Sequence, residues 1–188
     1  FLESTVFPGT TETICKKILL SNKNKITKED FFLGYSSERI NPGDRKYNLK
    51  NISKVVSINA NKKIISRVKK IYNNVSRKIV ISKKIKEAEL SKLIENTQRD
   101  LNISLMNEIM ILCNRTNLDF NEVIKLAKTK WNFLKFEPGL VGGHCLPVDP
   151  YYLSWKAREY GVNTRFIELA GEINRAMPEW VISKVTDS

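Results

Sequence analysis

The residue of this sequence best suited to covalent chemistry is a cysteine that follows two glycines. Cys145 lies in the run Gly142-Gly143-His144-Cys145-Leu146-Pro147-Val148-Asp149-Pro150. Glycine lets the backbone approach a ligand closely, and the prolines make the segment stiff. A thiol is the best side-chain nucleophile at neutral pH, and loops with so much specified backbone usually hold a site. The run therefore predicts a nucleophilic Cys145, with an inert buried thiol as the alternative.

The cysteines and the histidine predict no metal site. His144 is the only histidine, and as a sequence neighbour of Cys145 it points elsewhere in most loop conformations. We expect it to pack or to hydrogen-bond, with a general-base role as the alternative. Cys15, Cys113 and Cys145 are odd in number and far apart, so they form neither a disulfide framework nor a CxxC metal knuckle.

Three polar residues farther upstream recur at helical spacing. Lys92, Asn96 and Arg99 stand at i, i+4 and i+7, which places them on one face of a helix. Because apolar residues interleave with them, a partly buried ammonium and amide would suit a developing oxyanion. The alternative is an ordinary solvated face on which Glu95 pairs with Arg99.

Two pairs of polar residues follow predicted strands. Ser4-Thr5 ends the first strand candidate, and Glu38-Arg39 comes directly after another. Ligands bind at the carboxyl ends of strands in an open parallel sheet. Taken alone, each pair is weak support for a site.

The elements that must position these residues alternate between strands and helices as far as Ser82. The predicted strands are Phe1–Val6, Phe31–Tyr35, Val55–Ile58 and Val75–Ser82; the predicted helices are one capped by Thr10, with Ile14, Ile18 and Leu19 on one side, and one over Ile64–Tyr72. Strands separated by helices indicate a parallel α/β sheet. Its opening units are missing and the chain lacks an initiating Met, so we expect part of a longer protein.

After Ser82 the pattern is helical. Residues 85–113 contain neither Pro nor Gly, which predicts one long helix with the stripe Leu90, Leu93, Ile94, Thr97, Leu101, Leu105 and Ile109. Asp119 begins the next helix, which ends near Thr129, and Trp131–Pro150 reads as a loop. The last predicted elements are a helix over Tyr151–Tyr160 closed by Gly161, a helix from about Thr164 to Ala176, and another that Pro178 opens.

The charge of the chain is concentrated in its first half. The formal net charge is +12; residues 1–93 hold 21 basic and 8 acidic residues, net +13, and residues 94–188 hold 11 and 12, net −1. This asymmetry raises a nucleic-acid-binding module as an alternative. Only Tyr72 interleaves with the basic residues of 62–86, so we expect no nucleic acid. Without a long apolar run or a signal-peptide pattern, we expect a cytoplasmic protein and no membrane partner.

Five ordered segments resemble the UDP-glucose/GDP-mannose dehydrogenase family. They are ESTVFPGTTE, FFLGYSSERINPGD, EAELSKLIENTQRDLNISLMNE, TKWNFLKFEPGLVGGHCLPVDPYYL and INRAMPEWV. GGHC with VDPYYL is similar to the branch acting on UDP-N-acetylhexosamines, and TKWNF with PGLVGGHC to the Vi-antigen-type UDP-N-acetylglucosamine or UDP-N-acetylgalactosamine 6-dehydrogenases. The resemblance implies an α/β fold: the C-terminal part of a Rossmann-like parallel sheet in residues 1–82, an all-helical middle domain with one long helix in 83–177, and the start of a UDP-sugar domain in 178–188.

The resemblance also implies a reaction, the four-electron oxidation of the sugar C6 alcohol to a carboxylate with NAD, for surface polysaccharide synthesis. Cys145 matches the nucleophile that forms a thiohemiacetal and then a thioester. The other catalytic matches are Lys92 and Asn96 at the oxyanion, Asp149 for ordering water and protons, Glu38 as the base that releases the thioester, and Thr5, which holds water near the nicotinamide. Implied substrate contacts are Arg39, Arg99, Phe136, Gly142 and Gly143; implied cofactor contacts are Ser4, Thr5 and Glu38.

Departures from the family pattern leave alternatives open. The chain has Ser36-Ser37-Glu38-Arg39 where the family usually has Ser-Pro-Glu-Arg, and Leu146-Pro147 where the similar branch often has Ile-Gly. The family's Gly-rich dinucleotide fingerprint is expected upstream of Phe1, so the chain alone should be inactive. The family's long helix implies a homodimer, and a non-catalytic dimerisation module is a second alternative.

Overall fold

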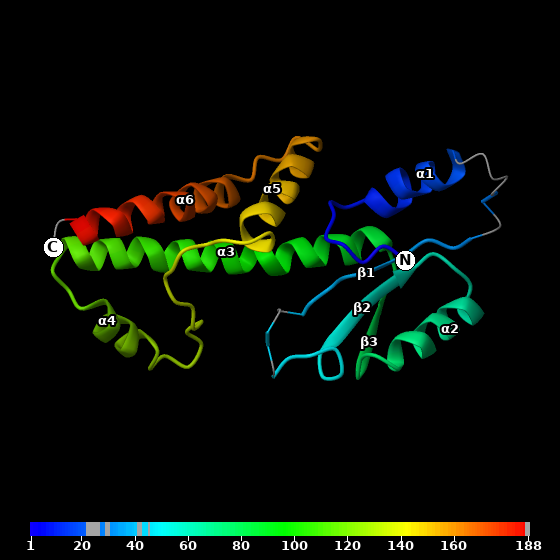
Figure 1. The fold of residues 1–188 in the computed structure, drawn as a ribbon, viewed down its shortest axis with the longest axis horizontal. Coiled ribbons are helices and arrows are strands. Elements are labelled where there is room, and N and C mark those ends of the chain that lie inside the picture. Colours follow the sequence, from blue (N-terminus) through cyan, green and yellow to red (C-terminus); the bar gives the residue numbers. More distant parts are fainter. Residues whose placement is uncertain (22–26, 29–30, 41–42, 45, 187–188) are drawn as a thin grey trace. The chain divides into compact units, whose positions relative to one another are not determined.

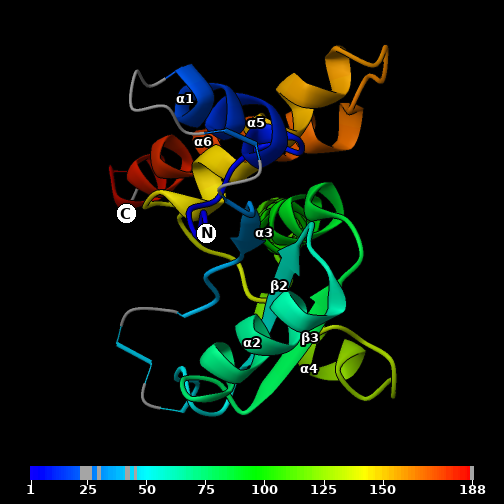
Figure 2. The same cartoon turned by 90° about the vertical axis from the view of Figure 1, so that its right-hand side faces the viewer.

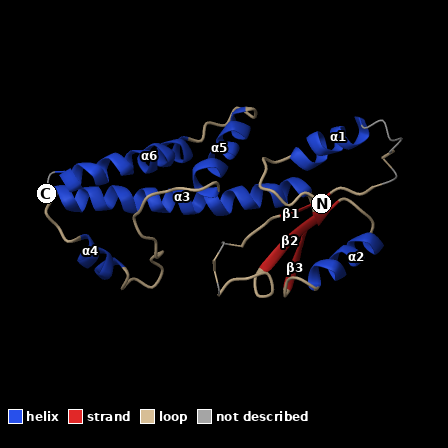
Figure 3. Ribbon diagram, viewed as in Figure 1, coloured by secondary structure: helices blue, strands red, loops and turns tan. Residues whose placement is uncertain are grey.

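The chain folds into two units that differ in secondary structure. The computed structural model describes residues 1–21, 27–28, 31–40, 43–44 and 46–186. The two units are Phe1–Leu93 and Ile94–Ser188. In the described part of the chain, the strands all lie in the first unit and the elements after them are helical (Figure 3). This confirms the predicted α/β class, with a small sheet followed by a helical region.

The first unit is built on a three-stranded sheet in the order β1 (Gly34–Ser36), β2 (Ser53–Ile58), β3 (Lys78–Ser82). β2 and β3 are parallel and are joined through helix α2 (Lys62–Asn73), as predicted; Asn61 caps the helix by accepting from the Ile64 N–H. In both views α2 lies against the sheet (Figures 1 and 2).

Strand β1 departs from the parallel arrangement that the sequence predicts. It pairs antiparallel with β2, with Tyr35 opposite Ser57. The described part of the connection, within residues 37–52, contains no helix, and a crossover helix is what parallel neighbours require. The predicted strand Phe1–Val6 is reduced to one parallel bridge between Leu2 and Tyr35.

The two faces of this sheet are buried by different helices. Because successive side chains of a strand point to opposite faces, Val55 and Val56 enter separate clusters. Val55 packs with Tyr35 and with Ile85 of helix α3 (Ile85–Arg115). Val56 packs with Val68 of α2. The start of α3 is thereby part of the core of the first unit.

The first helical segment is held by a residue that the sequence did not single out. It comprises a π-helical turn, η1 (Thr11–Cys15), and α1 (Lys16–Ser21). The predicted cap at Thr10 is wrong, since its hydroxyl donates to the Phe7 carbonyl instead. The fully buried carboxylate of Glu89 on α3 accepts the N–H groups of Gly9 and Thr11, at 2.5 and 2.9 Å. The predicted apolar side of this helix, Ile14, Ile18 and Leu19, is exposed.

The helices of the second unit follow the predicted order with two shifts. α3 is confirmed, and α4 (Phe120–Ala127) begins at the predicted cap, where Asp119 accepts from the Asn121 N–H. The first shift is that α5 (Cys145–Arg158) begins six residues before the predicted Tyr151. The second is that Pro178 opens no new helix, because α6 (Arg165–Thr186) runs through it.

The end of α5 confirms the predicted role of a glycine. Gly161 has φ +70°, and its N–H donates to the Arg158 carbonyl while the Val162 N–H donates to Ala157. These are the two bonds of a Schellman motif, which requires a left-handed residue. None of the described helices combines the length and apolar composition that crossing a bilayer requires.

Candidate functional site

Cys145 is the first residue of helix α5 and its side chain is exposed. The preceding turn is made by Gly143, whose φ of +80° favours glycine. Pro147 is tolerated in the first turn because N–H groups there have no intrahelical acceptor, which is why the predicted loop ends early. The remaining N–H groups of that turn can donate to an oxyanion formed beside the sulfur. His144 precedes the helix without a side-chain cap.

A buried pair, the Asn96 amide and the Asp149 carboxylate, lies one helical turn after Cys145 along α5. Asn96 of α3 donates through Nδ2 to Oδ2 of Asp149, at 2.5 Å, and both residues are buried. Asp149 is four residues after Cys145, so the two lie on the same side of α5. The second unit therefore brings together three of the predicted catalytic residues.

The buried side of α3 is polar over much of its length. Its buried residues include a row at i, i+3, i+7, i+11 and i+18, which is one helical face: Glu89, Lys92, Asn96, Asp100 and Asn107. In the predicted apolar stripe, by contrast, Ile94 is 51 % exposed and Leu105 48 %. Lys92 and Asn96 of the polar row were predicted from their helical spacing, whereas Glu89, Asp100 and Asn107 were not. Extending the same polar spacing in both directions along the helix would have found these three.

Lys92 belongs to this row and is buried in the first unit. No carboxylate among the described residues forms an ion pair with it. A lysine buried along its stem and without an ion pair can direct its charge at a ligand, and its role at an oxyanion stays a prediction.

Three further polar residues form a buried network in the second unit. Asn174 of α6 donates through Nδ2 to Oδ1 of Asp100, at 2.7 Å, and its Oδ1 accepts from Asn107 Nδ2 at 2.9 Å. Burial raises the pKa of the Asp100 carboxyl above its ordinary value of 3.8, although the Asn174 hydrogen bond and the charge of Arg175 oppose the rise. Neither Asp100 nor Asn107 was a predicted site residue.

The candidate residues of the first unit come directly after two neighbouring parallel segments in the sequence. Ser4 and Thr5 follow the Leu2 bridge, and Ser37 and Glu38 follow β1. Glu38 is exposed, and its Oε1 accepts the N–H groups of Arg39 and Ile40 at 2.7 and 2.8 Å. The buried Ser37 hydroxyl has no hydrogen-bond partner among the described residues.

The other candidates have less support from the geometry. Arg39 donates through Nη1 to the Ser53 carbonyl at 3.2 Å. Arg99, Gly142 and Gly143 are exposed, and Phe136 is half-buried. Their roles toward a substrate remain predictions.

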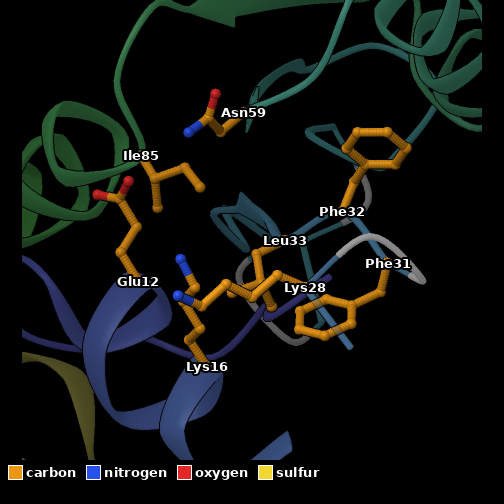
Figure 4. Close-up of a pocket in the computed structure, with 8 residues that line it drawn as sticks. All are labelled: Glu12, Lys16, Lys28, Phe31, Phe32, Leu33, Asn59 and Ile85. Atoms are coloured by element: carbon orange, nitrogen blue, oxygen red, sulfur yellow. The ribbon is translucent and has the colours of Figure 1, made fainter. Parts of the chain in front are cut away.

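Two of the pockets, one from each unit, differ in their position relative to the predicted site residues. One, of about 230 Å³, combines two lysines with two phenyl rings in the first unit (Figure 4); its lining is Glu12, Lys16, Lys28, Phe31, Phe32, Leu33, Asn59 and Ile85. It includes none of the predicted site residues. The other, also about 230 Å³, lies beside Leu146 and Pro147 and includes Asp100 and Asn174. In the described part of the chain no three metal-ligating side chains gather.

The sequence matches domains of one enzyme family over most of its length. Residues 1–76 match the NAD binding domain of the UDP-glucose/GDP-mannose dehydrogenase family, and residues 86–176 match its central domain. Protein CapL of Staphylococcus aureus is 47 % identical over 184 residues, 97 % of this chain and 43 % of its own length. UDP-N-acetyl-D-glucosamine 6-dehydrogenase of Salmonella typhi is 46 % identical over 180 residues, 95 % of this chain and 42 % of its own.

The fold has the same relatives. The structure of UDP-D-ManNAc dehydrogenase from Pyrococcus horikoshii superposes with a TM-score of 0.84 at 33 % identity, covering 98 % of this chain and 43 % of that one. The chain thus spans about two fifths of the length of the relatives it matches. With both domain matches in the family's order and the same fold in a solved relative, the chain belongs to the UDP-glucose/GDP-mannose dehydrogenase family.

Proposed function

We propose that the full-length protein oxidises the C6 alcohol of a UDP-N-acetylhexosamine, UDP-GlcNAc or UDP-GalNAc, to the uronic acid. The observation that carries the proposal is the exposed Cys145 at the start of α5, with the buried Asn96–Asp149 pair one turn behind it. The Salmonella typhi relative, named for UDP-N-acetyl-D-glucosamine, supports this substrate class. The product would serve surface polysaccharide synthesis.

The first unit offers groups that suit the polar parts of NAD. Ser4, Thr5 and the unpartnered Ser37 hydroxyl are short donors at the ends of parallel segments, where dinucleotides bind in such sheets. With Glu38 nearby in sequence, these are the residues that would hold the cofactor on this part of the chain. When bound, NAD⁺ accepts a hydride in each of the two oxidations, which is the chemistry no side chain supplies.

The residues of the chain carry the covalent steps. The Cys145 sulfur adds to the carbon of the C6 aldehyde and gives a thiohemiacetal, whose oxygen receives hydrogen bonds from Lys92 and Asn96. Asn96 uses one N–H on Asp149 and has a second for this oxygen. After oxidation to the thioester, water adds to the carbonyl carbon, Glu38 takes the proton, and the thiolate leaves as the acid is released. Asp149 orders the water.

The test is Cys145→Ala in the full-length protein, assayed with UDP-GlcNAc, UDP-GalNAc and UDP-ManNAc for NADH and for the acid by mass spectrometry. Loss of the nucleophile is expected to reduce acid formation by at least about 1,000-fold. Cys15→Ala, at a half-buried free thiol of the first unit, is the matched control and should keep wild-type turnover. Full acid production by Cys145→Ala would refute the mechanism.

A homodimer is the second part of the proposal. In the second unit, α3 and α6 form a groove of about 470 Å³ with an apolar lining that includes Leu105, Phe166 and Leu169. These side chains are 48 %, 81 % and 53 % exposed. Large apolar patches of this kind are uncommon on the surface of a monomer and mark interaction surfaces. A second copy of the chain would cover this groove.

The cytoplasm remains the proposed location, in keeping with three free cysteines.

A further inference from the structure

The segment that leads into Cys145 is tied to helix α3 by hydrogen bonds at a single residue, Gly139. Gly139 donates its N–H to Oδ1 of Asn107 at 2.9 Å, and its carbonyl accepts from Asn107 Nδ2 at 3.1 Å. Asn107 is fully buried. Both polar groups of one backbone residue are thus satisfied by one side chain. Among the described residues, 140–143 make no such bond, so Gly139 is where this segment is held.

We propose that Asn107 is a positioning residue, whose amide clamps the backbone N–H and C=O of Gly139 and so fixes the segment that presents Cys145. The inference rests on the proposed function for its catalytic meaning, since it assigns Cys145 as the nucleophile. Asn107 is too deeply buried, and too fully engaged by Gly139 and Asn174, to contact a substrate itself.

Only a primary amide of this length suits the position. The clamp needs an acceptor and a donor side by side, which asparagine provides in one group. Aspartate would present an oxygen to the Gly139 carbonyl and to Asn174 Oδ1, two contacts between acceptors. Leucine has the same size and would remove both hydrogen bonds from the half-buried Gly139 backbone.

The direction of the clamp is set by two further residues. The Asp100 carboxylate accepts, so Asn174 turns its Nδ2 toward it and its Oδ1 toward Asn107. Asn107 must then direct its Nδ2 at Asn174 and at the Gly139 carbonyl, which leaves Oδ1 for the Gly139 N–H. The hydrogen bonds that link Asp100, Asn174, Asn107 and Gly139 therefore have a single arrangement of donors and acceptors.

Cys145 is consequently bracketed by two amides of one helix. Asn107 holds Gly139, six residues before the cysteine, and Asn96 holds Asp149, four residues after it. The two amides are eleven residues apart on α3, close to three turns, so they share a face about 16 Å long. Misplacement of a nucleophile by about 1 Å can cost about 100-fold in rate, which gives such a bracket a function.

The experiment combines amide hydrogen exchange with steady-state kinetics on the full-length protein. In Asn107→Leu, exchange in peptides spanning 138–145 should rise by at least about 10-fold while peptides of α4 keep their rates. In Asn107→Asp, kcat per folded protein should fall by about 10- to 100-fold, with the KM for NAD changed by less than about threefold. Asn114→Asp, the same change at an exposed position of α3, is the control.

A second variant tests the direction of the bonds. Adding Asp100→Asn to Asn107→Asp lets the Asn174 amide turn over, so that it donates to the introduced carboxylate and accepts from the introduced amide. The turn gives up the weaker hydrogen bond from Asn174 Nδ2 to the Asp100 backbone carbonyl at 3.2 Å, so the recovery is partial. Part of the lost kcat should return, by at least about threefold. A role in stability alone predicts no such recovery.

Two results would overturn the proposal: wild-type exchange of 138–145 in Asn107→Leu, or faster exchange with undiminished kcat per folded protein. A wild-type protein that oxidises none of the UDP-N-acetylhexosamines would instead refute the proposed function. The exchange rates would still decide whether Asn107 holds the segment, so the two failures are distinguishable.

Discussion

Asp100 makes the stability of the second unit depend on pH. Because burial raises its pKa, the folded chain binds the proton more tightly than the unfolded chain does. Its contribution to the free energy of unfolding is therefore fully present below the ordinary value of 3.8 and is lost as pH rises through the folded-state pKa.

The corresponding prediction concerns Asp100→Asn, which removes the titration and keeps an oxygen for Asn174. The free energy of unfolding of the variant, measured by urea denaturation from pH 3.5 to pH 7, should improve relative to wild type as pH rises and then level off. Glu108→Gln, at an exposed carboxylate of the same helix, is the control. A difference between Asp100→Asn and wild type that does not change with pH would contradict the assignment.

At the residue scale, the sequence could predict the reactive side chains but not the buried side chains that hold the backbone around them. Cys145 and Asn96 were singled out from the residues alone, because a thiol beside glycines and polar groups at helical spacing have recognisable uses. Asp149 was proposed only through the family resemblance. Asn107 and Glu89 escaped because each acts on a backbone group 32 or 78–80 residues away. Spacing along one helix cannot reveal such a partner.

At the scale of elements, α3 anchors the N-terminal helical segment through Glu89. Its carboxylate satisfies two N–H groups of the turn at Gly9–Thr11 and is inaccessible to water. Glu89→Ala leaves both donors buried without an acceptor, and we expect a loss of about 3 kcal/mol in the free energy of unfolding. Glu89→Gln keeps one acceptor oxygen and should lose about half as much.

Chemical denaturation of the two variants measures this effect. The control is Glu87→Ala, two residues away on the same helix, where the side chain is 55 % exposed and pairs with Lys84 at 3.8 Å. Exposed pairs contribute under about 1 kcal/mol, so the control should lie near wild type. Equal losses at Glu87 and Glu89 would mean that the capping bonds do not stabilise the turn.

The predicted and observed elements differ at two kinds of place: helix boundaries near prolines, and the direction of strand β1. The long helix was predictable since residues 85–113 contain nothing that breaks a helix. The start of α5 was missed because Pro147 and Pro150 indicated a loop, although Pro147 stands in the first turn, where proline is tolerated, and the helix continues through Pro150. Pro178 was mistaken for a boundary although α6 continues through it as well. Strand β1 is antiparallel to β2, and no helix is found in the described part of their connection.

At the scale of the whole molecule, the proposed dimer makes the oligomeric state depend on α6. Phe166→Glu puts a charge into the apolar groove at a side chain 81 % exposed, so the fold should tolerate it. Sedimentation velocity of the full-length protein should show a shift from dimer to monomer. Trp131→Glu, at a side chain 92 % exposed outside the groove, should leave the dimer intact. Dimers of unchanged stability in Phe166→Glu would exclude this surface.

The uneven charge of the chain follows its division into two units. The +13 of residues 1–93 and the −1 of residues 94–188 divide where the two units divide. The basic residues of α2 lie mostly on its exposed side, opposite Val68 in the core. Charge therefore distinguishes the two units without naming a partner.

Because the segment is held at Gly139 and Asp149, the residues between Gly139 and Gly143 are not needed to hold it in place. Residues 140–143 carry no hydrogen bond that the anchors need, and six residues from Gly139 to Cys145 reach up to about 20 Å, more than the 16 Å between the amides on α3. A protein engineer could vary residues 140–142 and keep the nucleophile in place, provided that Gly143 remains to supply the turn at φ +80°.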